Sequence, residues 1–520
     1  MKRLFVVRLL ASVAVLFFAA DSVFSQTDFE KFKQKQLEQQ RRFRQQYHNE
    51  YDAFRKRIND EYADFVERIW NDYNAFKGIP TPKEEPVPPV VMPEEDKNEP
   101  IEDNPIVIEE VVEPIKPEPQ PEPIKPIEPQ PVVEPEPVKP QKDPVKPVEP
   151  KPVQEPMLTV SFYGTAMQVR LDANKRFTLS DTKESTIADA WRLISDGRYN
   201  AAIADCLSLR EKHQLSDWAY LQLLQKVGNE VYGKNCNEAT LLSAYFYCQS
   251  GYKMRLAKAD DRIVMLFASK HQIFEYPYFS FEGDSDYFYA LDKEANGLQV
   301  CQASFPQEKP LSLYARKNPI LEVQATMVKN RTAKGTGLVC ETKSEQHLLD
   351  YYATYPTSML NDNPMTRWAM YANTPLSQIA KETLYPQLTS AMKDLTKTEK
   401  VMVLLDWVQT AFEYEYDDKV WGGDRAFFAD ESLYYPYCDC EDRSILFTRM
   451  VRDLVGLPCI LVYYPGHLAA AVCFEEPIAG DYISLGDKRF TICDPTFINA
   501  PIGATMPDMD NKSAKVILLE

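Results

Sequence analysis

The sequence predicts a mixed α+β protein whose C-terminal domain packs one cysteine-bearing helix on an antiparallel sheet. Three observations favour this fold class. Cys440 begins a helical pattern that stops at 456–458, His467 opens an apolar, strand-like run, and Asp494 closes another. His467 lies 27 residues after Cys440, and Asp494 lies 27 residues after His467. These spacings leave room for a helix and a strand, and then for a strand pair.

The first segment, residues 1–25, is predicted to be a secretory signal. Lys2, Arg3 and Arg8 precede an apolar core from Leu9 to Ala20, and small residues near Ser25 suit cleavage. The apolar core is too short to span roughly 30 Å of hydrocarbon. No cysteine stands at the cleavage point. We therefore expect an exported protein, periplasmic or at the cell surface, without a transmembrane or lipid anchor.

Residues 26–78 are predicted to form one long amphipathic, coiled-coil-like helix. Apolar side chains recur at steps of three and four between Tyr47 and Phe76, and Gly78 and Pro80 end the pattern. A stripe of this length needs a partner surface. We expect self-association or docking on the chain's own domain, and an envelope partner is the alternative.

Residues 79–156 read as a proline-rich linker. They hold 24 of the 39 prolines and no glycine, in repeats of Glu-Pro and Lys-Pro. Such a composition cannot bury a core and favours polyproline II. The sequence therefore predicts a disordered, stiff spacer here.

Residues 157–395 are predicted to be a mixed helical and then β-rich accessory region. Four helical patterns are followed by short alternating strands and by two more helices, the second with a break at Pro386. The expected helices are 187–195, 200–213, 217–232, 238–249, 346–354 and 377–395, and the expected strands are 254–256, 262–268, 273–282, 287–291 and 298–303. This region carries no catalytic motif, so its expected role is to support the substrate groove.

The predicted catalytic domain, residues 396–520, begins with a capping box of Thr396 and Glu399. An aromatic and charged loop, 414–428, precedes the cysteine helix. Trp421, within this loop, and Tyr437, after it, are candidate residues of the substrate groove. Trp421 could equally fill a gap in the core. The pair 422–423 is a turn or hinge of two glycines.

Cys440 is the candidate nucleophile. Asp439 is a suitable N-cap and Asp442 completes a capping box, which places the sulfur at a helix N-terminus. The unpaired N–H groups and the helix dipole favour the thiolate there. Cys438 is the rival, but it precedes the N-cap. His467, at the start of one strand-like run, and Asp494, at the end of another, are the candidate base and carboxylate.

Three short motifs resemble those of a known family. C-E-D-R-S, G-H-L-A and C-D-P-T are similar to the motif blocks of the transglutaminase-like superfamily of papain-fold cysteine enzymes. From Trp407 onward the chain also resembles secreted transglutaminase-domain proteins of Bacteroidetes-type bacteria. The resemblance implies Cys440 as nucleophile, His467 as base, Asp494 as the orienting group, and acyl transfer through a thioester.

Composition limits the possible partners. The 520 residues carry a net charge of −18, which argues against nucleic acid and anionic membranes. The five histidines show no metal-binding spacing, and Cys438-x-Cys440 lacks a second cysteine pair, so we expect no metal and no cofactor. If Cys440 is free, nine of the ten cysteines remain, so at least one more is expected to be unpaired.

The sequence thus predicts an exported cysteine enzyme that attacks amide bonds of proteins or peptides through a thioester. Hydrolysis by a peptidase or amidase is favoured over a cross-linking transglutaminase because water alone suffices as acceptor. The alternative is a non-enzymatic, envelope-spanning scaffold whose C-terminal domain only binds.

Overall fold

The computed structural model describes residues 42, 49, 52–78, 102–108, 110–114, 156–274, 276–292, 296–306 and 308–520. Their arrangement is mixed α+β with antiparallel and mixed sheets, which confirms the predicted class. The predicted signal peptide and most of the proline-rich segment lie outside the described residues. In the described part, no helix combines the length and apolarity needed to cross a membrane.

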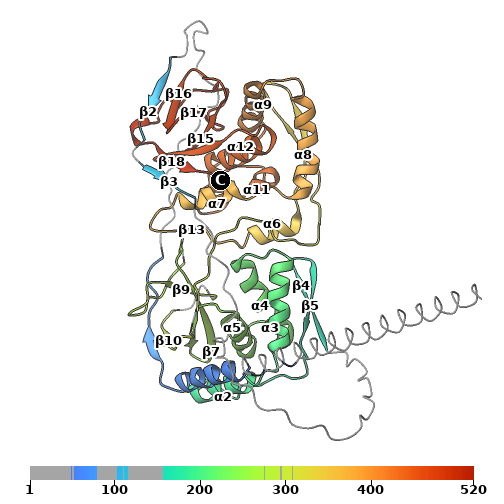
Figure 1. The fold of residues 1–520 in the computed structure, drawn as a ribbon, viewed down its shortest axis with the longest axis vertical. Helices are drawn as coiled ribbons and strands as arrows, with labels where there is room; N and C mark the ends of the chain where they lie inside the picture. The colour runs from blue at the N-terminus through green and yellow to red at the C-terminus, as the bar shows by residue number, and fades with distance from the viewer. Residues whose placement is uncertain are drawn as a thin grey trace, which may run out of the picture.

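The accessory half, drawn in green at the bottom of Figure 1, combines four helices with a five-stranded sheet. The first four predicted helices are confirmed. They are α2 (Glu184–Ile194), α3 (Asn200–Lys212), α4 (Asp217–Tyr232) and α5 (Asn237–Gln249). The sheet runs in the order β1 (Asn71–Tyr73), β10 (Leu298–Cys301), β6 (Met254–Ala259), β7 (Arg262–Ser269) and β9 (Tyr287–Ala290).

Three strand pairs complete this half and join it to the next. The predicted strand 273–282 is reduced to β8, because its chain then meets neighbours only through isolated bridges. The pairs are β4 (Met157–Phe162) with β5 (Thr165–Arg170), β8 (Gln272–Ile273) with β13 (Ser358–Met359), and β11 (Lys329–Thr332) with β12 (Val339–Thr342).

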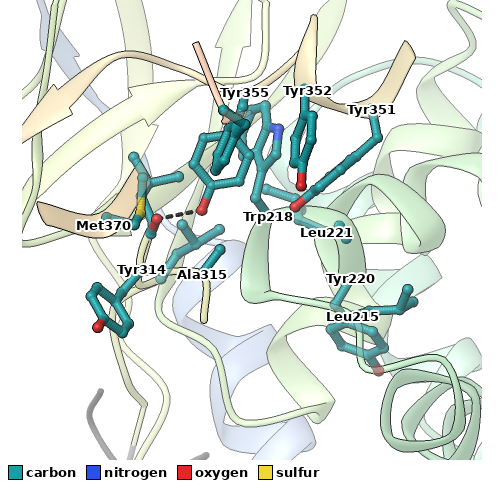
Figure 2. Packing of buried hydrophobic residues seen from close by; sticks show 14 of the residues in the cluster. Leu215, Trp218, Tyr220, Leu221, Tyr314, Ala315, Tyr351, Tyr352, Tyr355 and Met370 are labelled. Carbon is teal, nitrogen blue, oxygen red and sulfur yellow. Dashed lines mark hydrogen bonds between the residues drawn. The ribbon is translucent and has the colours of Figure 1, made fainter. Parts of the chain in front are cut away.

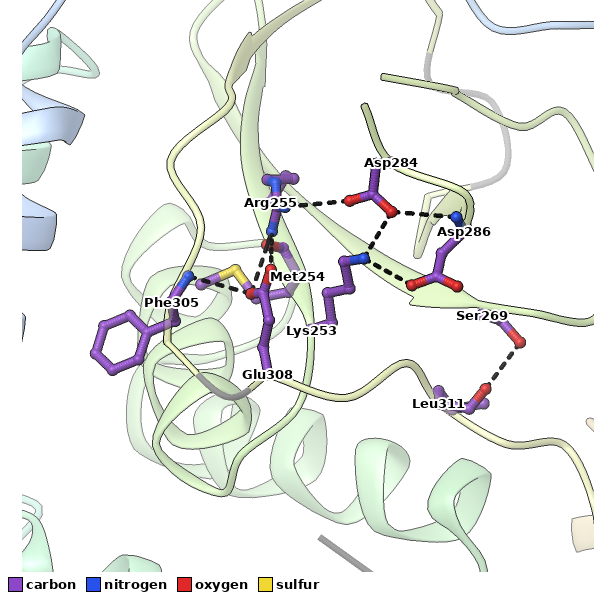
Figure 3. A network of polar contacts seen from close by, with 9 residues as sticks. All are labelled: Lys253, Met254, Arg255, Ser269, Asp284, Asp286, Phe305, Glu308 and Leu311. Atoms are coloured by element: carbon purple, nitrogen blue, oxygen red, sulfur yellow. Dashed lines mark hydrogen bonds and ion pairs between the residues drawn. The ribbon is translucent and has the colours of Figure 1, made fainter. Parts of the chain in front are cut away.

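A buried ionic network stabilises the accessory sheet (Figure 3). Lys253 bonds Asp284 and Asp286, both at 2.6 Å, and the neighbouring Arg255 bonds Glu308 at 2.9 Å. These side chains are at most 15% exposed, so each charge needs its partner. The network fixes two loops against the start of β6.

The C-terminal half carries the remaining helices and a seven-stranded sheet. The helices are α6 (Gln346–Tyr352), α7 (Thr366–Asn373), α8 (Gln378–Ala391), α9 (Lys397–Thr410), α10 (Asp417–Val420), α11 (Ala429–Tyr434), α12 (Cys440–Leu454) and the short η1 (Asn511–Ser513). The sheet order is β2 (Asn104–Ile106), β16 (Asp481–Leu485), β17 (Lys488–Cys493), β15 (His467–Cys473), β14 (Cys459–Tyr464), β18 (Lys515–Leu518) and β3 (Glu110–Val112).

The predicted break at Pro386 is wrong, because α8 continues through it. Proline removes one N–H, which leaves the carbonyl of Glu382 without its helical partner. Glu382 and Pro386 are both exposed, so water can donate a hydrogen bond to the Glu382 carbonyl. The cost is therefore small enough for packing of Leu384 and Leu388 to maintain the helix.

The long helix predicted over 26–78 ends earlier than expected. The chain is helical over 52–66 and then turns into β1, which pairs with β10. Asn59 is buried, and its side chain exchanges hydrogen bonds with Gln249 at 3.0 Å and accepts one from Trp191 at 3.0 Å. This part of the helix therefore docks on the chain's own accessory half.

The linker predicted over 79–156 contains two strands that belong to the seven-stranded sheet. β2 pairs in parallel with β16, and β3 pairs in parallel with β18, at opposite ends of the strand order. The local run N-P-I-V-I-E-E-V-V is rich in β-branched residues, and its proline lies in an edge strand, where a missing N–H is tolerated. The prediction of a spacer is therefore wrong for these residues.

These two pairings require a strongly curved sheet. Ile106 and Glu110 are joined by a stretch that reaches at most about 14 Å when extended. The edges of a flat seven-stranded sheet would lie roughly 29 Å apart. The edges must therefore approach each other, and the segment 102–114 closes the gap between β16 and β18 (Figure 1).

An aromatic cluster joins the two halves into one core. In Figure 2, Tyr351, Tyr352 and Tyr355 of the α6 region lie beside Trp218 of α4. The Trp218 indole N–H donates to the Thr354 carbonyl at 3.1 Å, and the hydroxyls of Ser216 and Tyr351 share a hydrogen bond at 2.7 Å. Within the C-terminal half, Tyr352 stacks on Phe428 with ring centroids 3.9 Å apart, a contact that contributes about 0.5–1.5 kcal/mol beyond the buried area. The two halves therefore share one core.

Replacing Asn59 by alanine should destabilise the whole protein. Trp191 and Gln249 would lose their buried partner, at a cost of about 2–3 kcal/mol. Thermal melting of the full chain should show a clear decrease for Asn59→Ala. Glu61→Gln on the exposed face of the same helix is the control, and equal melting of the two variants would contradict the docking.

Candidate active site

Cys440 is the first residue of α12, as predicted. Asp439 is the N-cap, its side chain accepts from the N–H of Asp442, and the carboxylate of Asp442 accepts from the N–H of Asp439. This capping box places the sulfur beside the positive end of the helix. Burial, together with the nearby Asp417, raises the pKa of Asp442 well above its usual value.

The residues after Cys440 fix the helix in the core. The Arg443 guanidinium is buried and donates to the carbonyls of Gln409 and Phe412, each at 3.0 Å. Ser444 donates to the carbonyl of Leu468 at 2.8 Å. The motif C-E-D-R-S therefore bonds α12 to the end of α9 and to the strand that carries His467.

His467 is the first residue of β15. Tyr464 pairs with it across a two-residue turn of Pro465 and Gly466, whose φ of +76° suits glycine. The His467 side chain is buried, and its Nε2 lies 2.8 Å from Oδ2 of Asp494. Nδ1 has no hydrogen-bond partner among the described residues. One ring nitrogen is thus held and the other is available.

Asp494 is held by its own turn and by α9. The N–H groups of Thr496 and Phe497 donate to its Oδ1 at 2.9 and 3.3 Å, which leaves Oδ2 for His467. Gln409 donates to the Asp494 carbonyl at 2.9 Å. The motif D-P-T therefore works as a carboxylate-capped turn, and Gln409 positions it.

One cavity brings the predicted nucleophile and base together. It measures about 470 Å³, and both Cys440 and His467 line it. Asp494 lies behind His467 and does not line it. The structure therefore places all three predicted catalytic residues at one site, on α12, β15 and the turn after β17.

A buried ion pair forms another wall of this cavity. Arg367 bonds Asp424 and lies 3.8 Å from Glu441. Burial alone would lower the pKa of Arg367, but the two carboxylates raise it above its usual value, so the guanidinium stays charged. Glu441 accepts from the Cys440 thiol at 3.7 Å. Arg367 thus offsets a negative charge that would otherwise oppose the thiolate.

Sequence reasoning missed several cavity residues. Arg367 and Trp368 lie in the first turn of α7, and the Trp368 indole N–H donates to Glu441 at 3.4 Å. Glu110 of β3 also lines the cavity and pairs with Lys515 at 2.7 Å. The run N-D-N-P before α7 was a local signal of a turn leading into a helix. The closeness of α7 to Cys440 could not be predicted from this signal, because the two are distant in sequence and only the folded chain brings them together.

Several carboxylates near Cys440 lie close enough together to share a cation. One group is Asp417, Asp424 and Glu441, and another is Asp417, Asp439 and Asp442. Protein donors already contact them: the N–H of Arg425 bonds Asp417 at 2.6 Å, and that of Phe427 bonds Asp442 at 2.7 Å. We therefore assign no metal site to them.

The two predicted groove residues lie outside the Cys440 cavity. Trp421 packs against Tyr435, at 4.8 Å between ring centroids, and lines a neighbouring cavity. Tyr437 lines neither cavity, because the segment before α12 is bound through its backbone to Glu413. Neither residue therefore lines the cavity that holds Cys440, and of the two only Trp421 lines an adjoining cavity.

None of the ten cysteines forms a disulfide. Burial makes several of the other thiols poor nucleophiles. Burial raises the pKa of Cys438, although the nearby Arg443 lowers it in part. Burial also raises the pKa of Cys459 to about 12 and that of Cys340 to about 11. These residues behave as small buried hydrophobes.

Cys440 should be the first of these cysteines to react with iodoacetamide at about pH 6, since its helix terminus and His467 favour the thiolate. Peptide mapping of the folded protein should place the label at position 440. Cys440→Ala should abolish labelling and Cys438→Ala should spare it. Primary labelling of Cys438, or no labelling, would contradict the assigned nucleophile.

Arg367→Met should destabilise the site by about 3–5 kcal/mol, because Asp424 and Glu441 would be left buried without their cation. Denaturant unfolding of the full chain measures this change. Lys419→Met removes an exposed ion pair with Glu415 and is the matched control. Equal stability of both variants would show that the Arg367 charge is dispensable.

No protein-family model matches this chain, and neither does any curated protein or solved structure. The chemistry of the site therefore follows from its own residues: a cysteine at a helix N-terminus, a histidine with one available ring nitrogen, and a carboxylate that holds the other.

Proposed function

We propose that this protein is an exported, cysteine-dependent acyl-transfer enzyme of the transglutaminase-like, papain-fold type that acts on amide bonds of proteins or peptides. The observation that carries the proposal is the pairing of His467 Nε2 with Asp494 at 2.8 Å, while the buried Nδ1 has no partner among the described residues and His467 lines the same cavity as Cys440. A histidine held in this way can exchange a proton with a thiol.

The proposed reaction has two steps. The Cys440 thiolate attacks the amide carbonyl carbon, and the His467 imidazolium gives its proton to the departing amine as the C–N bond breaks. This leaves a thioester on Cys440. Water, or a primary amine, then attacks the thioester while His467 removes its proton, and the acyl product departs as the thiolate re-forms. Asp494 stabilises the imidazolium and fixes its orientation.

Hydrolysis is the favoured outcome because water alone suffices as acceptor. A glutamine peptide offered with and without a primary amine separates the two outcomes. Ammonia release without amine incorporation indicates an amidase, cleavage of the main chain a peptidase, and amine incorporation a transglutaminase. If the protein binds peptides but Cys440 forms no acyl adduct, the non-enzymatic scaffold becomes the better account.

His467→Ala should lower kcat for amide hydrolysis by about 10²–10⁴-fold, because proton transfer in both steps is lost. Asp494→Ala should have a smaller effect, since the imidazole remains but is no longer oriented. Asp487→Ala, in the exposed turn between β16 and β17, is the control. Full activity of His467→Ala would exclude it as the base.

A further inference from the structure

The proposed nucleophile and base are nearly enclosed. Cys440 is 1% exposed and His467 is 2% exposed, and the cavity that both residues line measures about 470 Å³. A cavity of this size encloses a ligand about as large as a drug molecule. A polypeptide that continues on both sides of the reacting amide needs a longer opening. For such a substrate to reach Cys440, one wall of the cavity must move.

One wall of the cavity is a row of side chains across four neighbouring strands. Glu110 of β3 pairs with Lys515 of β18. Lys515 pairs in turn with Tyr463 of β14, which pairs with Leu468 of β15. All four residues line the cavity. At the usual spacing between strands, the row extends roughly 14 Å from β15 to β3, so Glu110 lies at its outer end.

Glu110 links this wall to the loop before α7. Residues 361–363 of that loop also line the cavity. The Glu110 carboxylate pairs with Lys515 at 2.7 Å and accepts a hydrogen bond from the Asn363 side chain at 3.4 Å. Figure 1 shows β3 beside β18 and close to α7. The link therefore closes the cavity at the end of the row that is farthest from β15.

The segment that carries Glu110, residues 102–114, is called the strap. It is held by few buried contacts. Its strands β2 and β3 have three residues each and lie at the two ends of the described strand order. Among its described residues, only Ile106 and Val112 are buried. Its ion pairs with β17 and β18 join side chains that are 25–56% exposed, and such pairs contribute little. We therefore expect the strap to detach before the inner strands open.

We propose that the strap is a gate for the Cys440 cavity. In the docked state, Glu110 closes the outer end of the cavity, which then admits only small amides. Release of the strap removes Glu110 from the wall and opens the edge of β18, so a longer polypeptide can pass. Because the strap belongs to the same chain, its release is reversible. The inference rests on the proposed function and adds control of access to it.

Hydrogen exchange of the unmodified, full-length protein tests the release. The hydrogen-bonded amides of β2 and β3 should exchange at least on the order of tenfold faster than those of β14 and β15, through local opening. Added salt should accelerate exchange of the strap because it screens the exposed ion pairs. Exchange of the strap at the rate of β14 and β15 would overturn the proposal, since the strap would then open only with the whole fold.

Alkylation of Cys440 in the full chain tests whether the strap controls access. The measured quantity is the labelling rate with bulky, uncharged N-pyrenylmaleimide divided by the rate with iodoacetamide. Glu110→Ala should raise this ratio on the order of tenfold, because a charged, hydrogen-bonded link is lost. Glu113→Ala, an exposed glutamate of the same strap, is the matched control and should leave the ratio unchanged.

A second variant releases the strap through its apolar anchors. Ile106→Ser/Val112→Ser should raise the ratio at least as much as Glu110→Ala does. An excess of a synthetic peptide with the strap sequence should then lower the ratio again by docking in place of the strap. A ratio that stays high with the peptide, or an unchanged ratio in Glu110→Ala, would overturn the gate. If the double variant does not fold, Glu110→Ala and hydrogen exchange of the unmodified chain still decide.

The two measurements separate the gate from the enzyme. Fast exchange of the strap with a Cys440 that iodoacetamide does not label would retain the releasable strap and remove the proposed enzyme. A reactive Cys440 with a strap that exchanges only with the inner strands would retain the proposed enzyme and remove the gate.

Discussion

The geometry of the site depends on the way in which Arg443 is buried. Its guanidinium is enclosed in the core and bonds the carbonyls of Gln409 and Phe412 at the end of α9. The Gln409 side chain in turn holds the carbonyl of Asp494, and Ser444 holds the strand of His467. One polar frame thus connects the three elements that carry the site. Because a buried charge without partners is costly, the frame keeps these elements in register.

The curvature of the seven-stranded sheet is a second constraint. The segment 102–114 pairs with β16 and with β18, so it closes the sheet and brings Glu110 into the wall of the Cys440 cavity. Helix 52–66 and β1 similarly complete the accessory half. Described parts of the N-terminal region are therefore structural components of the two halves. A site built in this way depends on residues more than three hundred positions upstream of its nucleophile.

The two halves are joined through a shared core. The Trp218 indole of α4 donates to the Thr354 carbonyl at 3.1 Å, and Ser216 shares a hydrogen bond with Tyr351 at 2.7 Å. Trp421 lines a cavity beside this junction and not the cavity that holds Cys440. The aromatic loop before α12 therefore packs where the two halves meet.

Local signals in the sequence determined the helices of the accessory half, the capping box of α12, the placement of His467 at a strand start and the turn at Asp494. Each depends on residues within a few positions of one another, where capping, periodicity and turn chemistry act. The tertiary structure alone decided the path of α8 through Pro386, the docking of helix 52–66, the strands at 104–106 and 110–112 and the approach of Arg367 to Glu441. These features depend on pairing between residues far apart in the chain, and the free energy of such contacts outweighs local composition.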